Sequence, residues 1–430
     1  MTITVIGHGY VGLVSSCVFA ELGNTVWVIG RNPEKLKKLS SGDPLIYEPG
    51  LEEILKSNLK KGNLHFTSEY EEAISSSDIV FIAVGTPSTP SGQADTKTVF
   101  EVVRKLTPHL KRGFTVVSCK STVPLGTNKK VEVEINKALP KEAEFAVASC
   151  PEFLREGFSL TDTLNPDRIV IGTESQKAKE LLLKLHEPLP GHRIVVNLDS
   201  AELIKYAANC LLATKISFAN LISFYCERSG ADVEQVMDAV GLDKRINRAF
   251  LDAGAGYGGA CFPKDVKALI SIGQDLGINT SLLDSVEKIN ESAKKNIVNK
   301  IIKNTNGKHI ALWGLAFKPN TDDIRSATSL VVISELLAAG YKVTAYDPKA
   351  VDNVKNVYPD QITYADDPYS ALTGADALCV LTEWEEFVNT DLKKVKSLLK
   401  SPVIVDGRNI WDPAQMKEMG FTYIGVGKHT

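Results

Sequence analysis

The sequence predicts an α/β protein in which two doubly wound domains are joined by an all-helical central domain with a long connecting helix. Three observations predict this class. Short β-branched runs alternate with helical patterns in residues 1–198, strand patterns vanish in residues 199–304, and the alternation returns in residues 305–430. We therefore expect three domains with these boundaries.

The N-terminal region contains five short apolar runs of the kind that form buried parallel strands. Amphipathic segments separate several of them, as in a sheet covered by helices on both faces. The predicted strands are Ile3–Ile6, Thr25–Ile29, Ile79–Val84, Thr115–Lys120 and Ile169–Ile171.

The central region is predicted to be helical throughout. Ser200–Ser229 carries apolar residues at helical spacing, and Leu282–Ile302 is predicted to be the long helix that connects the two α/β domains. The C-terminal region then repeats the α/β pattern. Its predicted strands are His309–Trp313, Lys342–Tyr346, Ala377–Leu381 and Val403–Val405, with a helix over Ser329–Ala339.

The bulk composition excludes several classes of protein. The 430 residues are 43% hydrophobic and carry a formal net charge of -3, which argues against general affinity for nucleic acid or anionic membranes. No apolar stretch approaches the roughly 20 residues that span a bilayer. The seven cysteines are widely spaced, with no Cys-x-x-Cys pair, so neither a metal site nor a disulfide framework is indicated. We expect a reduced, cytoplasmic protein without a metal.

The most specific motif follows the first predicted strand. Gly7-His8-Gly9-Tyr10-Val11-Gly12 matches the glycine pattern of dinucleotide sites in the required strand–turn–helix context. Gly7 permits a tight turn, Gly9 lets the backbone approach a pyrophosphate, and Gly12 allows close helix packing. The helix N-terminus offers free N–H groups to the phosphates. The motif predicts a Rossmann-like nicotinamide site, and hence an oxidoreductase.

The end of the second predicted strand leaves the cofactor undecided. NAD-selective sites carry an acidic residue about 20 residues past the glycines, where it binds the ribose hydroxyls. Here Gly30 occupies that position and Arg31 follows it. A guanidinium suits the 2′-phosphate of NADP. The alternative is NAD, with Arg31 solvated and Asn32 serving the ribose.

Polar loops follow other predicted strands. Gly85-Thr86-Pro87-Ser88 and Ser121–Thr127 come at strand ends, where loops of an open α/β sheet line the ligand crevice. Pro151–Gly157 places two carboxylates, Glu152 and Glu156, four residues apart. A surface helix pair is the alternative explanation for those two carboxylates.

A glycine-rich tract in the central region predicts a nucleophile. Gly254–Asp265 has four glycines within its first six residues, which we expect to expose backbone amides to a ligand. Cys261 ends this loop and precedes a predicted helix over Pro263–Leu276. The helix dipole and Lys264 would both favour its thiolate. The alternative is an inert, small apolar cysteine.

Two further strand-end tracts predict a second nucleotide site. Trp313–Arg325 supplies Lys318 and Arg325, and Asp406-Gly407-Arg408-Asn409 adds another guanidinium. Surface salt bridges are the alternative for each of these cations.

These motifs, in this order, resemble the UDP-glucose/GDP-mannose dehydrogenase family from Gly7 to Asn409. The tracts Gly256–Asp265 and Phe317–Arg325 look like its UDP-glucose branch. The resemblance implies a four-electron oxidation of UDP-glucose to UDP-glucuronate with two nicotinamide cofactors. The same chemistry on GDP-mannose or a UDP-N-acetylhexosamine is the alternative.

The resemblance also implies a mechanism. Cys261 would attack the aldehyde intermediate to give a thiohemiacetal, and hydride loss would leave a thioester for hydrolysis. Lys205 and Asn209, four residues apart on a predicted helix, would stabilise the oxyanion. Asp265 and Thr122 would position the hydrolytic water or relay protons, and the candidate general base is Glu152.

The resemblance implies a homodimer whose core is the helical domain and in which Arg245 reaches the site of the neighbouring subunit. It also implies the residues that bind the substrate and the cofactor. The substrate set is Glu152, Phe153, Leu154, Arg155, Lys205, Asn209, Arg245, Phe250, Leu251, Asp252, Ala253, Gly254, Gly258, Phe317, Lys318 and Arg408. The cofactor set is Gly7, Gly9, Tyr10, Val11, Gly12, Gly30, Arg31, Lys35, Gly85, Thr86, Thr122, Glu156, Lys264 and Arg325.

Three departures from the family pattern stand out. Gly30-Arg31 replaces an acidic residue, and Cys150 stands where Asn commonly precedes Pro-Glu-Phe. Asn247 follows Arg245-Ile246 where Gly is usual, which predicts a different turn in the Phe250–Gly254 loop.

Two other functions remain as alternatives. An ordinary two-electron dehydrogenase, such as a hydroxyacid enzyme with Lys205 as its acid/base, would need no thiol. A non-catalytic nucleotide-sugar sensor would bind ligand without reducing a cofactor, but the chain keeps Cys261, Lys205 and the dinucleotide loop together.

Overall fold

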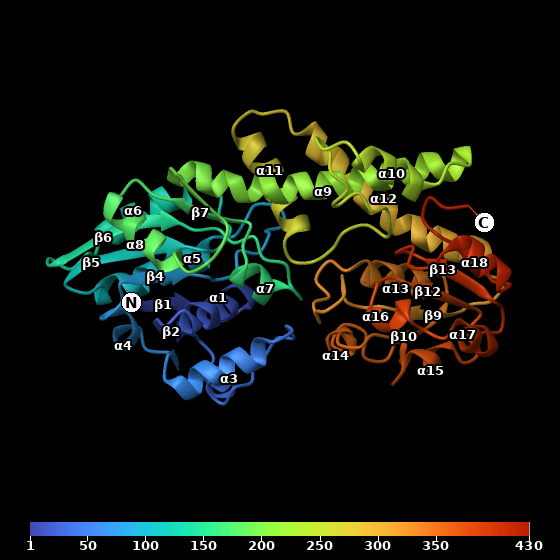
Figure 1. Ribbon diagram of the computed structural model, residues 1–430, viewed down its shortest axis with the longest axis horizontal. Helices are drawn as coiled ribbons and strands as arrows, with labels where there is room; N and C mark the ends of the chain where they lie inside the picture. The colour runs from blue at the N-terminus through green and yellow to red at the C-terminus, as the bar shows by residue number, and fades with distance from the viewer. Residues whose placement is uncertain (430) are drawn as a thin grey trace. The chain divides into compact units, whose positions relative to one another are not determined.

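The computed structural model describes residues 1–429, which form two compact units (Figure 1). Unit 1 comprises Met1–Ala208 and Lys267–Leu276, and unit 2 comprises the remaining described residues. The helix α9 (Leu198–Ser229) contributes residues to both units, as does α11 (Phe262–Asp275). The predicted three-domain division stays a prediction.

Unit 1 is built on an eight-stranded sheet in the order β3-β2-β1-β4-β5-β6-β7-β8. Neighbouring strands are parallel except β6 and β7, which are antiparallel where Ser149 faces Gly172. The prediction that Ile169–Ile171 is a parallel strand was therefore wrong toward β6 and right toward β8. The strands are β1 (Thr2–Ile6), β2 (Thr25–Ile29), β3 (Leu64–Thr67), β4 (Ile79–Ile82), β5 (Gly113–Cys119), β6 (Ala143–Ser149), β7 (Arg168–Gly172) and β8 (His192–Val196).

Helices cover both faces of this sheet, which explains why its central strands read as continuous apolar runs. Along β1, Ile3 and Val5 join a core with α1, α3 and α8, whereas Ile6 joins a second core with α4, α5 and α6. The helices are α1 (Tyr10–Glu21), α2 (Pro33–Ser40), α3 (Leu51–Lys61), α4 (Tyr70–Ile74), α5 (Lys97–Leu106), α6 (Thr127–Asn136), α7 (Ser159–Leu164) and α8 (Gln176–His186), with a 3₁₀ turn over Thr107–His109.

Unit 2 holds the remaining central helices and a six-stranded parallel sheet in the order β11-β10-β9-β12-β13-β14. No strand lies within residues 199–304, as predicted. The strands are β9 (His309–Trp313), β10 (Lys342–Tyr346), β11 (Thr363–Tyr364), β12 (Ala377–Val380), β13 (Val403–Asp406) and β14 (Thr422–Ile424). The helices are α10 (Val233–Gly241), α12 (Ser281–Asn304), α13 (Thr328–Ala338), α14 (Val351–Lys355), α15 (Pro368–Leu372), α16 (Glu385–Val388), α17 (Leu392–Leu398) and α18 (Pro413–Glu418).

The two sheets repeat one topology. The first six strands of unit 1 and all six of unit 2 follow the same spatial order, and their first turns match in detail. Gly7 donates its N–H to Ile29 O at 3.0 Å, and Gly314 donates to Tyr346 O at 2.9 Å. Asp347, which follows Tyr346, therefore occupies in unit 2 the position that Gly30 occupies in unit 1.

Asp347 closes the turn of unit 2 from within. It is buried, and its carboxylate accepts hydrogen bonds from four backbone N–H groups and one indole N–H. These bonds hold the loop after β9 against the end of β10. The donors are Leu315, Ala316, Lys349, Ala350 and Trp384, at 2.7–3.1 Å.

The helix α9 corrects one expectation from composition. Among residues 1–429 it is the one helix long and apolar enough to cross a membrane, although the sequence was predicted to contain no such stretch. Its most apolar 18-residue window is 39% buried inside the protein. Glu202 and Lys205 are also buried on this helix and form polar contacts with their surroundings. The buried part of α9 thus packs against protein, whereas most of its apolar window is not buried.

Candidate active site

The turn between β1 and α1 has the geometry expected of a dinucleotide site. Gly7 has φ +112°, and a Cβ added there would lie 2.4 Å from Ala83 O. A Cβ on Gly12 would lie 2.0 Å from Gly7 O, so both positions require glycine. A Cβ on Gly9 would meet nothing within 4 Å, and no side chain caps the start of α1. The turn is therefore tight on its protein side and open on the side where a pyrophosphate would bind.

Basic groups surround the position that usually holds an acidic residue. Arg31 is exposed and forms no hydrogen bond or ion pair with any residue in the part of the chain that the structure describes. It lies near Tyr70: burial raises the pKa of that phenol, and Arg31 opposes the rise. Asn32 Oδ1 accepts the N–H of Lys35 at 3.1 Å and caps α2. The oxygen of Asn32 is therefore engaged in the helix cap, which weakens its candidacy as the ribose ligand.

The loops after β4 and β5 lie side by side, as their predicted strand-end positions required. Thr86 Oγ1 donates to Thr122 O at 2.8 Å, and Ser121 Oγ donates to Val84 O at 2.7 Å. Thr86 is buried and Thr122 half-buried. Two candidate cofactor residues are thus brought together at the carboxyl end of the sheet.

Glu152 and Lys205 form a buried ion pair. Lys205 Nζ lies 3.0 Å from Glu152 Oε1, and the two side chains are 3% and 8% exposed. Leu154 N–H donates to Glu152 Oε2 at 2.8 Å and fixes the carboxylate. The segment Pro151–Gly157 is not helical, and Glu156 is also buried. The alternative of a surface helix pair was therefore wrong.

Sequence reasoning missed Lys120, the residue that directly follows β5. This lysine is buried, and burial lowers the pKa of its ammonium group, with Cys150 and Glu152 opposing. Cys150 is itself buried, and burial raises the pKa of its thiol. The departure at position 150 thus places an uncharged side chain beside a buried lysine. The predicted strand over Thr115–Lys120 was the available signal, because it placed Lys120 at the carboxyl end of a strand.

In unit 2, Asp265 of α11 is hydrogen bonded to α9. The family resemblance implies catalytic residues on both of these helices. Asn209 Nδ2 of α9 donates to Asp265 Oδ2 at 2.6 Å, and Lys264 Nζ contacts the same carboxylate. Asp265 is 1% exposed. Lys264 is consequently engaged by a carboxylate, so its charge supports a Cys261 thiolate less than was expected from the sequence.

Cys261 is the one cysteine of the seven that is not buried. It directly precedes α11, and its carbonyl accepts the N–H of Asp265 at 2.8 Å as the first hydrogen bond of that helix. Burial raises the pKa of Cys17 and Cys119 to about 12. A thiol that is not buried and lies at a helix N-terminus is the arrangement expected of a nucleophile, and this role stays a prediction, as does the alternative of an inert, small apolar cysteine.

The glycine-rich loop does not offer its amides to a ligand in the way that was predicted. Four of its N–H groups donate to other parts of unit 2. Added Cβ atoms on Gly254 and Gly258 would lie 2.7 and 2.5 Å from the carbonyl oxygens of Gly407 and Ser326. The glycines therefore permit backbone packing inside the protein. The donors Gly254, Ala255, Tyr257 and Gly259 reach Asn220 Oδ1, Gly407 O, Asn290 Oδ1 and Arg325 O respectively, each at 2.8 Å.

The cations of the predicted second nucleotide site make intramolecular contacts. Arg325 pairs with Asp323 at 2.5 Å, and Lys318 lies over the Phe317 ring at 5.4 Å. Arg408 donates from Nε to Leu381 O at 2.8 Å and pairs with Glu383. Arg408 is only 19% exposed at its side chain, so it organises the loops at the carboxyl end of the sheet rather than forming a surface salt bridge.

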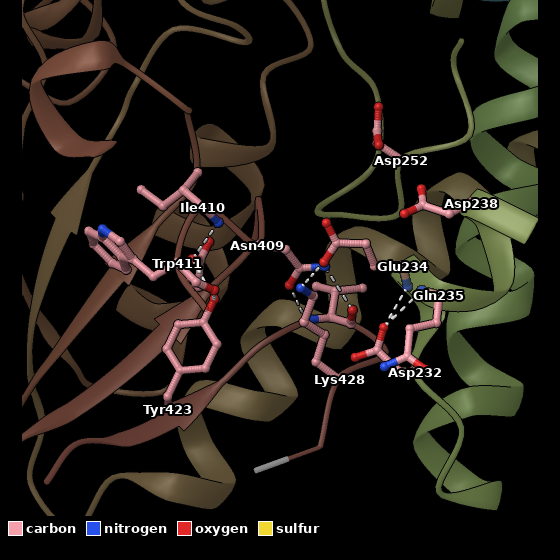
Figure 2. Close-up of polar contacts among 12 residues, drawn as sticks. Asp232, Glu234, Gln235, Asp238, Asp252, Asn409, Ile410, Trp411, Tyr423 and Lys428 are labelled. Carbon is pink, nitrogen blue, oxygen red and sulfur yellow. Dashed lines mark hydrogen bonds and ion pairs between the residues drawn. The ribbon is translucent and has the colours of Figure 1, made fainter. Parts of the chain in front are cut away.

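The C-terminal segment contacts the loop that carries Asn409, the residue after Arg408 (Figure 2). Asn409 donates to Val426 O at 2.9 Å and accepts from Val426 N–H at 2.8 Å. Lys428 pairs with Glu234 at the start of α10. The last described residues thereby connect this loop to the central helices of unit 2.

The backbone is left-handed at two residues around the start of the Phe250–Gly254 loop, and the predicted difference in its turn stays a prediction. Asn247 has φ +64° and Phe250 has φ +65°. Asn adopts this region far more readily than other non-glycine residues, so it can serve where relatives use glycine. Arg245 is 88% exposed at its side chain and pairs with Asp243.

The structure distributes the candidate residues over both units. Unit 1 holds Gly7, Gly9, Tyr10, Val11, Gly12, Gly30, Arg31, Lys35, Gly85, Thr86, Thr122, Glu152, Phe153, Leu154, Arg155, Glu156 and Lys205. Unit 2 holds Asn209, Arg245, Phe250, Leu251, Asp252, Ala253, Gly254, Gly258, Cys261, Lys264, Asp265, Phe317, Lys318, Arg325 and Arg408. Arg155 pairs with Asp162 at 2.7 Å, and Tyr10 donates to Tyr47 O at 3.0 Å.

Comparisons with known proteins match this chain along nearly its whole length. The NAD binding domain of the UDP-glucose/GDP-mannose dehydrogenase family matches residues 1–190, its central domain matches residues 199–292, and its UDP binding domain matches residues 311–413. The UDP-glucose 6-dehydrogenase TuaD of Bacillus subtilis is 46% identical over 99% of this chain and 93% of its own length. The UDP-glucose 6-dehydrogenase of Pseudomonas aeruginosa is 44% identical over 100% of this chain and 98% of its own.

Solved structures give the same result. A UDP-glucose dehydrogenase from Pyrobaculum islandicum superposes with a TM-score of 0.93 at 39% identity, covering 100% of this chain and 98% of that one. A UDP-D-ManNAc dehydrogenase from Pyrococcus horikoshii superposes with a TM-score of 0.88 at 27% identity, over 99% of each chain.

Proposed function

The chain belongs to the UDP-glucose/GDP-mannose dehydrogenase family, and on that premise we propose that it oxidises UDP-glucose to UDP-glucuronate in two successive hydride transfers. The observation that carries the proposal is the single accessible thiol of the chain, Cys261. It begins the helix whose first turn holds Asp265 against Asn209. An accessible thiol distinguishes this four-electron chemistry from a two-electron hydroxyacid dehydrogenase, which needs none.

Each nicotinamide accepts one hydride, so complete oxidation of one alcohol to an acid consumes two. The open side of the turn at Gly9 and the uncapped start of α1 fit the pyrophosphate of such a cofactor. We infer that Thr86 and Thr122, joined by their hydrogen bond, line the same site.

We propose the following roles for the residues of the site in the two oxidation steps. In the first oxidation the substrate hydroxyl loses its proton as its carbon loses a hydride, giving the aldehyde. The Cys261 thiolate then adds to the aldehyde carbon, and the ammonium group of Lys205 and the amide of Asn209 stabilise the resulting alkoxide. Loss of a second hydride gives the thioester.

Hydrolysis completes the sequence. A water molecule, deprotonated by Glu152, attacks the thioester carbonyl and expels the Cys261 thiolate, releasing the carboxylate product. We infer that Asp265, whose carboxylate accepts a hydrogen bond from Asn209, takes part in proton transfer. Glu152 keeps its place through Lys205 and the N–H of Leu154.

The stoichiometry of cofactor reduction tests this function. Purified protein given limiting UDP-glucose and excess cofactor is expected to form two reduced nicotinamides per sugar, measured by absorbance, with UDP-glucuronate as the product. One reduced nicotinamide per sugar would instead support the two-electron alternative. Binding without any absorbance change would support a sensor, and the same assay with GDP-mannose or a UDP-N-acetylhexosamine tests the other substrates.

We further propose that Arg31 allows the chain to use NADP as well as NAD. Its guanidinium is exposed, makes no ion pair among the described residues, and follows the position where a carboxylate would repel a 2′-phosphate. Arg31→Ala is expected to weaken NADP binding about 10-fold, as loss of a charged hydrogen bond predicts, and NAD binding less than about 2-fold.

Titration calorimetry with each dinucleotide measures this difference. Arg112→Ala is the control, because Arg112 is also exposed and pairs with Glu142. A wild-type protein that binds NAD far more tightly than NADP, with Arg31→Ala unchanged, would contradict this proposal.

A homodimer formed through α9 is the proposed assembly. Leu211, Phe218 and Tyr225 follow one another at spacings of seven residues and are 63%, 47% and 66% exposed, so they form one apolar stripe. Phe218→Asp is expected to convert the dimer to a monomer, measured by light scattering after size-exclusion chromatography. Val133→Asp, at an exposed apolar site on α6, should remain dimeric.

All seven cysteines are free, which supports the proposed reducing, cytoplasmic location.

A further inference from the structure

The reason for glycine at position 30 lies in the space around it. Gly30 does not have a positive φ, so its backbone conformation is open to any residue. A Cβ added there would lie 2.7 Å from His8 Cδ2 and 2.7 Å from Leu36 Cδ2, with His8 Nε2 at 3.2 Å. Real Cβ atoms do not approach other atoms so closely. A side chain at position 30 would therefore require the ends of two neighbouring side chains, His8 and Leu36, to shift.

Both neighbours would have to shift, and of the two only His8 belongs to the glycine motif. Leu36 is 8% exposed on α2. His8 is half-buried in the turn between Gly7 and Gly9. Burial lowers the pKa of its imidazole, and the nearby Lys35 lowers it further, which favours an uncharged ring against Gly30. The ring thus occupies the space in which the side chain of residue 30 would begin.

We propose that His8 and Gly30 form one specificity-determining pair, in which the imidazole excludes an acidic side chain from position 30. The adenosine ribose would then meet Arg31 and Lys35 with no carboxylate between them. The inference rests on the proposed binding of a nicotinamide dinucleotide at the Gly7–Gly12 turn. It adds that His8, which occupies a variable position of the glycine motif, determines cofactor selection.

The pair predicts that substitutions at the two positions are strongly coupled. Gly30→Asp alone is expected to weaken NAD and NADP binding about 10-fold each, because the new side chain displaces the imidazole beside the turn. His8→Ala alone should change either affinity less than about 3-fold. In His8→Ala/Gly30→Asp the imidazole is gone and only the end of the Leu36 side chain has to shift, so the carboxylate can accept from the ribose hydroxyls. NAD binding should therefore recover at least about 10-fold over Gly30→Asp, while NADP binding stays weak.

Titration calorimetry with NAD and NADP on the four proteins gives this cycle without relying on activity. Equal NAD affinity in Gly30→Asp and in the double variant would overturn the inference, because position 30 would then act independently of His8. Gly30→Ala and His8→Ala/Gly30→Ala repeat the cycle with the Cβ alone. That second cycle decides the question if the aspartate variant fails to fold.

Binding of UDP to all variants serves as the control, since the family's UDP binding domain matches residues 311–413. Wild-type protein that binds UDP but neither dinucleotide would overturn the proposed cofactor site and this inference together. Wild-type protein that binds a dinucleotide and shows no coupling would overturn the inference alone.

Discussion

Replacing Cys261 by serine is expected to lower kcat for UDP-glucose oxidation at least about 1000-fold, because a serine hydroxyl is a far weaker nucleophile than a thiolate. The first oxidation does not use the thiol, so the variant should form at most one reduced nicotinamide per sugar. Rapid-mixing absorbance measurements, with the enzyme in excess over UDP-glucose, separate the two hydride transfers.

The matched control for this change is Cys226→Ser. Cys226 is buried in unit 2 and lies outside the proposed site. Its replacement should leave activity per folded molecule within about threefold of wild type. Alkylation with iodoacetamide provides a second measurement, and mass spectrometry should find Cys261 modified first, since the other six thiols are buried. A Cys261→Ser variant that still forms two reduced nicotinamides per sugar near the wild-type rate would refute the thioester mechanism.

Replacing Lys205 by methionine is expected to have two separable effects. Loss of a positioned oxyanion donor should lower kcat about 100- to 1000-fold. Glu152, left buried without its ion pair, should also destabilise the protein by about 3–5 kcal/mol, measured by urea unfolding.

The double variant Lys205→Met/Glu152→Gln separates stability from activity, because it has no unpaired buried charge but lacks both proposed catalytic groups. It removes both charges, so the free energy of unfolding should return toward the wild-type value while kcat stays low. Recovery of kcat together with stability would mean that Lys205 acts only through the fold.

The strands best predicted from the sequence were those buried on both faces. Thr25–Ile29, His309–Trp313 and Lys342–Tyr346 were predicted with the bounds that the structure shows, because burial on both sides selects an unbroken apolar run. The strands that were missed lie mainly at sheet edges or are very short. β8, largely exposed, and the two-residue β11 leave no such pattern in the sequence.

The features of the site also divide into those that local sequence predicts and those that depend on contacts between distant residues. The glycine turn at Gly7 was predictable because its requirements are local: one strand, one tight turn and one helix. The internal bonds of the Gly254–Gly259 loop were not, because its acceptors Asn220 and Gly407 are distant in sequence. The contact of His8 with Gly30 likewise needed the paired ends of β1 and β2 in three dimensions.

Asp347 has a consequence for how the two halves of such a chain diverge in evolution. Both sheets keep the same strand order and the same first turn, as duplication of one ancestral unit would leave them. In the C-terminal copy, however, the aspartate after β10 satisfies the N–H groups of Leu315 and Ala316 that begin the loop. The two copies thus differ at one position. In unit 1 the turn is proposed to bind a dinucleotide, whereas in unit 2 its N–H groups are bonded to Asp347 and stabilise the fold.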